Sequence, residues 1–225
     1  MQYAKPAETP MIQNDCLSDE NKKKINFPYR EAVGSLLYIS SKTRPDIAYA
    51  VSFCSRKMEN PTRNDVNNVK RIMRYLKDTK ADGIVYRKTT QLEIAAYSDS
   101  DFAGDETTRK STTGYVVYYC NGPVTWCSRK QPVVALSSTE AEFIAAAECV
   151  KELLYIKVLI EHLTSNNLKV ILNIDNQSAI AIIKNGMKGA TCVYQRTDIT
   201  AEAQDALYRS FITDKSVISD ISVLT

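Results

Sequence analysis

Three acidic side chains in one short stretch have the clearest potential for chemistry. Asp99, Asp101 and Asp105 fall within residues 97–105, directly after an apolar run at 92–96 that is typical of a strand. Carboxylates gathered at the end of a strand are a common way to hold a divalent cation, because hard cations prefer oxygen ligands. Acidic loops of this kind also occur as ordinary turns that face water. The metal interpretation therefore depends on whether other elements bring carboxylates to the same place.

A second carboxylate comes from a long predicted helix, which begins at Ser138 or Thr139 and continues to about residue 163. One stripe of this helix repeats at spacings of four and three residues, so its members share a face. Glu142 lies at the N-terminal end of that face, whereas Glu140 points to the opposite side. A carboxylate bordering a core costs several kcal/mol unless it is paired or binds a metal. Glu142 is therefore expected to be either a metal ligand or a solvated side chain at the helix end. The stripe comprises Glu142, Ala146, Cys149, Leu153, Ile156, Ile160 and Leu163.

A third carboxylate, Asp175, follows an apolar strand predicted at 170–174. It is either the N-cap of the next helix, predicted at 177–184, or a ligand at the carboxyl end of a central strand, where open α/β sheets place their ligands. If this strand pairs with the strand before Asp99, the three carboxylates converge. Two Mg²⁺ ions about 3.5–4 Å apart, held by such a cluster, activate water and stabilise the leaving oxygen in phosphodiester cleavage.

The elements that must position these acids form a β-rich block followed by helix, strand and helix. Strands are predicted at 92–97, 113–120 and 124–128, and the turn signal Asn121-Gly122-Pro123 separates the last two. Three consecutive antiparallel strands, then a helix, a buried strand and a further helix, indicate an α/β fold.

The region before this block is predicted to be helical and basic. Residues 1–28 are polar and are expected to form an irregular tail, and helices are predicted at 29–41, 45–57 and 61–77. The first ninety residues carry 17 Lys and Arg against 10 Asp and Glu, which suggests a polyanionic partner. A solvated basic face explains the same pattern equally well. The basic flank of the third helix is made by Arg63, Lys70, Arg71 and Arg74.

Composition excludes several other classes. The chain has 225 residues, 44% of them hydrophobic, which suits one large or two small globular domains. None of the six cysteines forms a C-x-x-C pair, and the one histidine, His162, has no cysteine at zinc-ligand spacing, so no structural zinc is expected. No apolar run reaches the roughly 18–20 residues of a membrane span. With no signal peptide either, the chain is expected to be intracellular, in the cytoplasm or nucleus, not secreted and without a membrane partner.

Seven short motifs, in order and at consistent spacing, resemble the end of the Pol polyprotein of copia-type long-terminal-repeat retrotransposons. The resemblance runs from about Tyr29 to Asn185. The motifs are GSLLY at 34–38, TRPD at 43–46, RYLKDT at 74–79, YSDSDFAGD at 97–105, RKSTTGY at 109–115, ALSSTEAE at 135–142 and DNQSA at 175–179.

This resemblance implies two functional pieces. Residues 29–88 resemble a helical, thumb- or connection-like end of the reverse transcriptase, and the chain has no Tyr-x-Asp-Asp motif, so no DNA polymerisation is expected. Residues 89–186 resemble the ribonuclease H domain, with a mixed sheet of three antiparallel strands followed by parallel strands and flanking helices. In the family this domain cuts the RNA of RNA–DNA hybrids with two Mg²⁺ ions, for which Mn²⁺ is an alternative.

The family motif maps its catalytic, metal-binding acids onto Asp99, Glu142 and Asp175. The expected partners are an RNA–DNA hybrid and the remainder of a reverse transcriptase. The residues expected to contact nucleic acid are Arg63, Lys70, Arg71, Arg74, Arg109, Lys110, Asn176 and Gln177.

Residues 187–225 form a divergent C-terminal segment. The family continues there with a His-Ile-Asp motif that carries a fourth catalytic acid, whereas here Thr200 follows Ile199 and no histidine is present. Asp198 or Asp205 would have to replace that acid. Three interpretations therefore stay open: an active ribonuclease H, a catalytically inactive or truncated remnant that only binds nucleic acid or a partner protein, and another nuclease or transposase on a similar fold.

Overall fold

The computed structural model describes residues 4–12, 26–88, 93–186 and 193–195. Within these ranges the chain forms two compact units, the first ending at Ile84 and the second beginning at Val85. None of the helices in the described ranges is long and apolar enough to cross a bilayer. Each unit has a hydrophobic core of its own.

The first unit is a small helical bundle. It contains α1 (Tyr29–Lys42), a 3-10 turn η1 (Pro45–Ile47), α2 (Ala48–Ser55) and α3 (Arg63–Asp78). Thr62 and Asp65 form a reciprocal capping box at the start of α3, which satisfies backbone N–H groups that the helix itself leaves without acceptors. The apolar faces of the three helices close on one another, with Val33, Ile47, Val51, Val69 and Ile72 fully buried.

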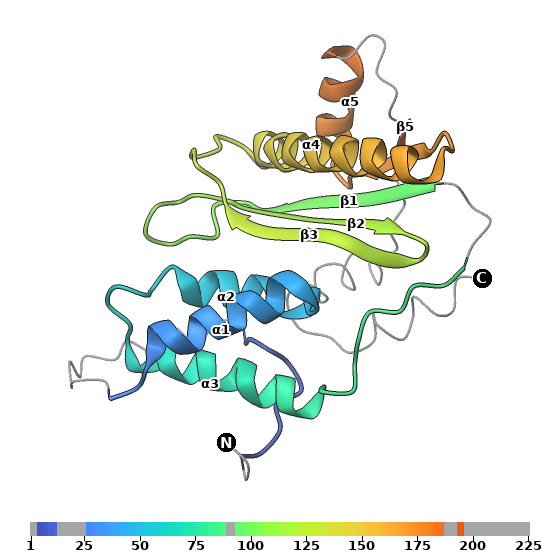
Figure 1. The fold of residues 1–225 in the computed structure, drawn as a ribbon. Coiled ribbons are helices and arrows are strands. Elements are labelled where there is room, and N and C mark those ends of the chain that lie inside the picture. The colour runs from blue at the N-terminus through green and yellow to red at the C-terminus, as the bar shows by residue number, and fades with distance from the viewer. Residues whose placement is uncertain (1–3, 13–25, 89–92, 187–192, 196–225) are drawn as a thin grey trace. The chain divides into compact units, whose positions relative to one another are not determined.

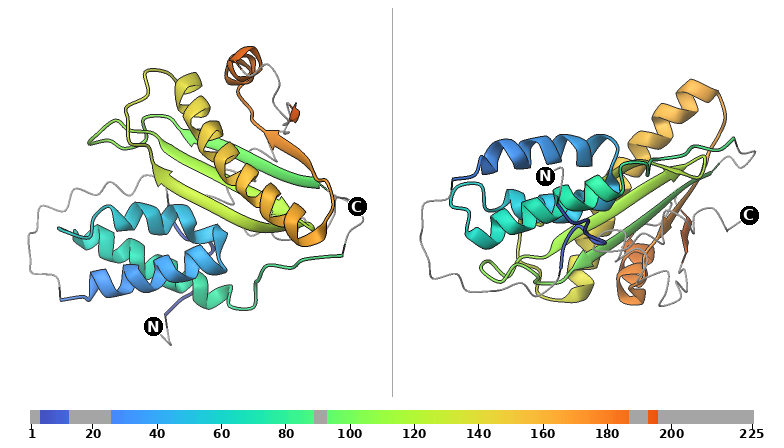
Figure 2. Two further views of the ribbon diagram at one scale, coloured as in Figure 1. Left: turned by 45° about the horizontal axis from the view of Figure 1, so that its top comes forward. Right: turned by 90° about the horizontal axis from the view of Figure 1, so that it is seen from below.

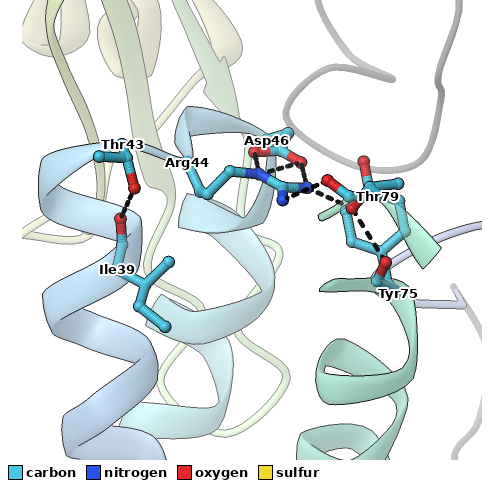
Figure 3. Close-up of polar contacts among 6 residues, drawn as sticks. All are labelled: Ile39, Thr43, Arg44, Asp46, Tyr75 and Thr79. Carbon is cyan, nitrogen blue, oxygen red and sulfur yellow. Dashed lines mark hydrogen bonds and ion pairs between the residues drawn. The ribbon is translucent and has the colours of Figure 1, made fainter. Parts of the chain in front are cut away.

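Two of the sequence motifs meet inside this unit, at a buried ion pair (Figure 3). The Arg44 guanidinium donates to both carboxylate oxygens of Asp46, with Nη2 at 2.6 Å from Oδ2. It also donates to Thr79, from Nη1 to the carbonyl at 3.0 Å and from Nη2 to Oγ1 at 2.6 Å. Its Cζ lies 5.5 Å from the centre of the Tyr75 ring. The TRPD and RYLKDT motifs thus fasten the start of η1 to the end of α3, which is a structural role.

Residues 4–12 have no regular secondary structure but pack against this bundle. Ala7 is buried in the core of the unit, and Met11 packs against that core. Lys77 Nζ donates to the carbonyl of Ala4 at 2.9 Å, and Arg71 Nη2 donates to Thr9 Oγ1 at 2.8 Å. This part of the expected tail is irregular, yet it is held by specific contacts along α3.

The second unit is a five-stranded mixed sheet with helices (Figure 1). Its elements are β1 (Glu93–Asp101), β2 (Thr112–Tyr119), β3 (Gly122–Lys130), α4 (Ser138–Thr164), β4 (Lys169–Asn173), α5 (Gln177–Gly186) and β5 (Val193–Gln195). The strand order is β3-β2-β1-β4-β5. The first three strands are antiparallel, β4 is parallel to β1, and β5 is parallel to β4. The predicted α/β fold, with three antiparallel strands followed by parallel ones, is confirmed.

Helix α4 lies across one face of this sheet (Figure 2). Cys149 and Leu153 of α4 are fully buried against a sheet face that includes Ile94, Val117 and Leu172. The predicted stripe of α4 is buried from Glu142 to Leu153, whereas Leu163 at its C-terminal end is 75% exposed. The N-terminal half of α4 is therefore fixed to the sheet, and this half carries Glu142.

The pairing of β1 with β4 brings distant residues to one edge of the sheet. Their register runs from Glu93 opposite Lys169 to Tyr97 opposite Asn173. Asn173 is buried and donates from Nδ2 to the carbonyl of Ala96 at 3.0 Å, which secures the end of β4 against β1. Asp99 and Asp175 each lie two residues beyond the last β1–β4 pair, Tyr97 and Asn173, so the two aspartates lie next to each other where this pairing ends.

Candidate metal centre

Three carboxylates from three elements meet at this edge of the sheet. Asp99 comes from β1, Glu142 from the second turn of α4, and Asp175 from the segment after β4. One oxygen of each carboxylate lies within 4.8 Å of the corresponding oxygens of the other two. Such a group of oxygen ligands suits a hard divalent cation.

Glu142 is the most deeply buried of the three, with 6% of its surface exposed. Its Oε1 accepts two hydrogen bonds from Ser100, from the backbone N at 2.9 Å and from Oγ at 2.7 Å. Its Oε2 is buried and has no hydrogen-bond partner within the described residues. Burial, and then repulsion from the Asp99 charge, raise the pKa of Glu142 to about 8, although the Ser100 hydrogen bonds act in the opposite direction. An acceptor oxygen left buried in this way fits a position that a cation would satisfy.

The local structure at the start of α4 selects Glu142 rather than Glu140. Ser137 caps the helix by accepting from the backbone N of Glu140 at 3.1 Å, so the predicted caps Ser138 and Thr139 are wrong by one or two residues. The Glu140 carboxylate turns back and accepts from the backbone N of Leu136 at 2.7 Å. Glu140 therefore helps to start the helix, and Glu142, two residues later, faces the sheet.

Asp99 and Asp175 are both partly buried. Burial raises the pKa of Asp99, and the nearby Asp175 charge raises it further, whereas hydrogen bonds with Ser100 and with the Glu142 side chain act in the opposite direction. Asp175 does not cap α5, because Asn176 does so: its Oδ1 accepts from the backbone N of Ala179 at 2.9 Å. Of the two interpretations of Asp175 from the sequence, the structure thus gives the capping role to its neighbour and places Asp175 in the cluster.

The other two acids of the opening stretch do not belong to this group. Asp105 organises the loop between β1 and β2: Oδ1 accepts from Thr108 N and Oγ1, and Oδ2 pairs with Lys130 at 3.2 Å. Burial alone would raise its pKa, but the Thr108 and Lys130 contacts outweigh burial and lower it to about 2. Asp101 lies against Gly104, where a Cβ would come within 1.9 Å of Asp101 Oδ2. A side chain at 104 would require the Asp101 carboxylate to move.

The residues predicted to contact nucleic acid divide between the two units. In the second unit, Arg109 is exposed, Lys110 Nζ donates to the carbonyl of Pro132, Asn176 caps α5, and Gln177 is exposed at the first position of that helix. In the first unit, Arg63, Lys70, Arg71 and Arg74 all lie on α3. Arg71 contacts Thr9, and Lys70 lies over the Phe27 ring at 5.4 Å, so both already make contacts within their own unit. The predicted substitutes for the fourth acid, Asp198 and Asp205, lie outside the described residues.

A buried polar group behind the carboxylates was not foreseen from the sequence. Gln131, 2% exposed, donates from Nε2 to Thr113 Oγ1 at 3.1 Å and to the carbonyl of Ala141 at 3.0 Å. It thereby ties the first turn of α4 to β2, directly beside Glu142. Buried Ser111 receives the backbone N–H of Ala103 at 3.0 Å and so holds the chain after β1. Only the uninterrupted polar run at 111–113 in an otherwise apolar strand hinted at this group.

The strand order and the placing of the carboxylates on β1, on α4 and after β4 define a ribonuclease H-like domain. Sequence comparison then identifies its origin. The chain belongs to the family of copia-type retrotransposon Pol polyproteins.

Two relatives illustrate the match. The retrovirus-related Pol polyprotein from transposon TNT 1-94 of Nicotiana tabacum is 40% identical over 195 residues, which is 83% of this chain and 15% of that polyprotein. The polyprotein from transposon RE1 of Arabidopsis thaliana is 44% identical over 162 residues, 71% of this chain and 11% of that polyprotein. The chain therefore spans only a small part of the length of these relatives.

Two other comparisons add little. No family model matches the chain. Among solved structures, LC11-RNase H1, isolated from compost, is similar at 13% identity with a TM-score of 0.35, covering 58% of this chain and 98% of that one.

Proposed function

We propose that the second unit is a metal-dependent ribonuclease that cuts the RNA strand of RNA–DNA hybrids. The observation that carries this proposal is the meeting of Asp99, Glu142 and Asp175 within 4.8 Å at one sheet edge. Three ionised carboxylates this close repel one another, and the repulsion is relieved either by a proton, as the raised pKa of Glu142 indicates, or by a bound cation. Family membership supports the choice of reaction, and the carboxylate-only ligand set supports Mg²⁺, or Mn²⁺ as an alternative.

Each carboxylate has a defined part in this proposal. Asp99, Glu142 and Asp175 would hold two divalent cations, which when bound supply an activated water and stabilise the leaving oxygen of a phosphodiester. The fold supplies the alignment: the β1–β4 pairing sets the separation of the two aspartates, and the packed first half of α4 fixes Glu142. The buried Glu142 Oε2 receives no hydrogen bond from an N–H or hydroxyl of the described residues, which supports its place as a ligand of such an ion.

The hybrid would be held mainly through its backbone. Exposed Arg109 lies in the loop between β1 and β2, and exposed Gln177 lies at the start of α5. Arginine and glutamine side chains commonly contact phosphates and ribose hydroxyls. Recognition would follow the shape of the hybrid and its 2′-hydroxyls and not the base sequence. We further propose that the first unit is the end of a reverse transcriptase and that Arg63 and Arg74 of α3 contact phosphates. We also propose that the protein works inside the cell, together with the rest of that enzyme.

A second candidate is a non-catalytic remnant that keeps the fold and binds nucleic acid or a partner protein. The sequence at 195–200 favours it, because Thr200 stands where the family has its fourth acid. Loss of one ligand from a two-metal site would weaken metal binding and lower or abolish cleavage.

A cleavage assay separates the two candidates. The full chain is incubated with a hybrid labelled on its RNA strand, with Mg²⁺ or with a chelator, and with single-stranded RNA and duplex RNA as control substrates. If the second unit is a ribonuclease, the hybrid should be cut in Mg²⁺ but not in chelator, and neither control RNA should be cut. The Asp99→Asn variant should no longer cut the hybrid, although its circular dichroism spectrum is unchanged. An intact hybrid in the presence of Mg²⁺ or Mn²⁺ would favour the remnant. Cleavage retained by Asp99→Asn would refute the assignment of the carboxylates.

A further inference from the structure

Ser100 contacts the Glu142 carboxylate from the neighbouring strand. It directly follows Asp99 in β1 and lies opposite Thr113 of β2. Its backbone N–H and its hydroxyl both donate to the same oxygen, Glu142 Oε1, at 2.9 and 2.7 Å. A single residue thus holds one edge of the carboxylate with two hydrogen bonds from two directions.

The geometry points to Ser100 as a positioning residue of the metal site, whose hydroxyl fixes the plane of the Glu142 carboxylate and so directs Oε2 towards Asp99 and Asp175. The inference rests on the proposed function, since it concerns the same site. One donor alone would leave the carboxylate free to turn about that bond, whereas two donors on Oε1 restrict this rotation. With Oε1 occupied by Ser100, Oε2 is the oxygen left to face the other two carboxylates, and no N–H or hydroxyl of the described residues donates to it.

The contact also links two ligands from different elements. Asp99 and Ser100 are neighbours on one strand, so the strand supplies one ligand directly and orients a second across the interface with α4. Hydrogen bonds to metal-binding carboxylates fix their orientation, and removing such a partner typically lowers metal affinity about 10- to 100-fold. Because the backbone N–H stays in any variant of Ser100, the lower end of this range, about tenfold, is expected from loss of the hydroxyl.

The strand itself offers a matched control. Ser98, two residues earlier, is also buried, with 6% of its surface exposed. Its hydroxyl has no hydrogen-bond partner in the described residues. Ser98→Ala therefore removes a buried hydroxyl from the same strand without touching Glu142, whereas Ser100→Thr changes the side chain at the critical position but keeps its hydroxyl.

The first measurement is Mn²⁺ binding to the full chain, followed by the electron paramagnetic resonance of free Mn²⁺. Ser100→Ala should weaken binding about tenfold, while Ser100→Thr and Ser98→Ala should bind as the unmodified protein does. Equal affinity of Ser100→Ala and the unmodified chain would overturn the inference. An equal loss in Ser98→Ala would also overturn it, because the effect would then reflect strand packing.

The second measurement keeps this inference distinct from the proposed function. If the unmodified chain binds no Mn²⁺, the proposed function fails, and the role of Ser100 is then decided by crystal structures without metal. In Ser100→Ala the Glu142 carboxylate should rotate about its remaining bond to the backbone N–H, and in Ser98→Ala it should not. A Glu142 carboxylate in the same orientation in Ser100→Ala would refute the positioning role whatever the metal result.

Discussion

The metal-free protein should lose stability as the pH rises from about 4.5 to about 8, and Glu142→Gln should largely remove this loss. Glu142 has an ordinary pKa of 4.5, which burial and the Asp99 charge raise to about 8 in the folded chain. The folded state therefore holds the proton more tightly than the unfolded chain does, and ionisation of Glu142 opposes folding. The stabilising contribution of the protonated form is complete below the lower value and is lost as the pH rises through the upper one.

The size of the effect follows from the interval between the two values. At pH 7 the pH lies about 2.5 units above the pKa of Glu142 in the unfolded chain. Each unit corresponds to about 1.4 kcal/mol, so the loss of stability is about 3–4 kcal/mol at most. Because Glu142 and Asp99 repel each other, their titrations are coupled and part of the effect belongs to Asp99. The measured loss in the free energy of unfolding is therefore expected to be about 1–3 kcal/mol. Glu142→Gln removes the ionising group while keeping a similar shape and an oxygen that accepts from Ser100. In chelator at pH 7 this variant should be more stable than the unmodified protein by that amount.

The single tryptophan of the chain provides the assay, because Trp126 lies in β3 of the second unit. Urea unfolding followed by its fluorescence, in chelator at intervals from pH 5 to pH 8, gives the free energy of unfolding of that unit. Glu140→Gln, which alters a carboxylate on the same helix but outside the cluster, should keep the slope of the unmodified protein. The reasoning is refuted if Glu142→Gln retains the full dependence on pH. Added Mg²⁺ should restore the stability of the unmodified protein at pH 7 and leave Glu142→Gln little changed.

Two further substitutions test the structure around the site. Arg44→Ala should destabilise the first unit by about 3–5 kcal/mol, because it leaves the buried Asp46 carboxylate without its partner; amide hydrogen exchange in α1 and α3 measures this, and unchanged protection there would contradict a structural role for the two motifs. Gln131→Leu should destabilise the second unit by about 1–3 kcal/mol, since the buried carbonyl of Ala141 loses its side-chain donor; an unfolding curve by Trp126 fluorescence that matches the unmodified protein would show that this clamp contributes nothing.

The positions of the three carboxylates could be predicted because each depends on a periodic pattern. The stripe of α4 distinguishes Glu142 from Glu140, and the order of strands and helices makes β1 and β4 the natural neighbours that bring Asp99 and Asp175 together. The capping residue was harder to predict, because Asp175 and Asn176 are both good N-caps and only the helix register separates them. The cap of α4 was predicted one or two residues too late for the same reason, since the three consecutive hydroxyl residues at 137–139 can each cap a helix.

Contacts between side chains distant in sequence could not be predicted in this way. The hydrogen bonds from Ser100 to Glu142 and from Gln131 to Ala141 depend on how closely α4 packs on the sheet. That packing distance cannot be predicted from the local sequence pattern. The packing of residues 4–12 on α3 was missed for a similar reason. Only Lys5, Glu8 and Thr9 of these nine residues are polar. Ala7 and Pro10 are buried and Met11 packs against the core, so these contacts and a few hydrogen bonds hold the segment.

The pairing of β1 with β4 also determines when, during synthesis of the chain, the three carboxylates can come together. Strands β1, β2 and β3 follow one another with no helix between them, so they can pair soon after they leave the ribosome, which favours their early folding. Asp99 is then in place, but the other edge of β1 stays open until β4 has been synthesised after the 27 residues of α4. A nascent chain that stops before residue 169 therefore holds two of the three acids and an unpaired strand edge, a state prone to aggregation. Asp175 therefore joins Asp99 and Glu142 just after the strand that closes this edge of β1, and β5 later pairs with the opposite edge of β4.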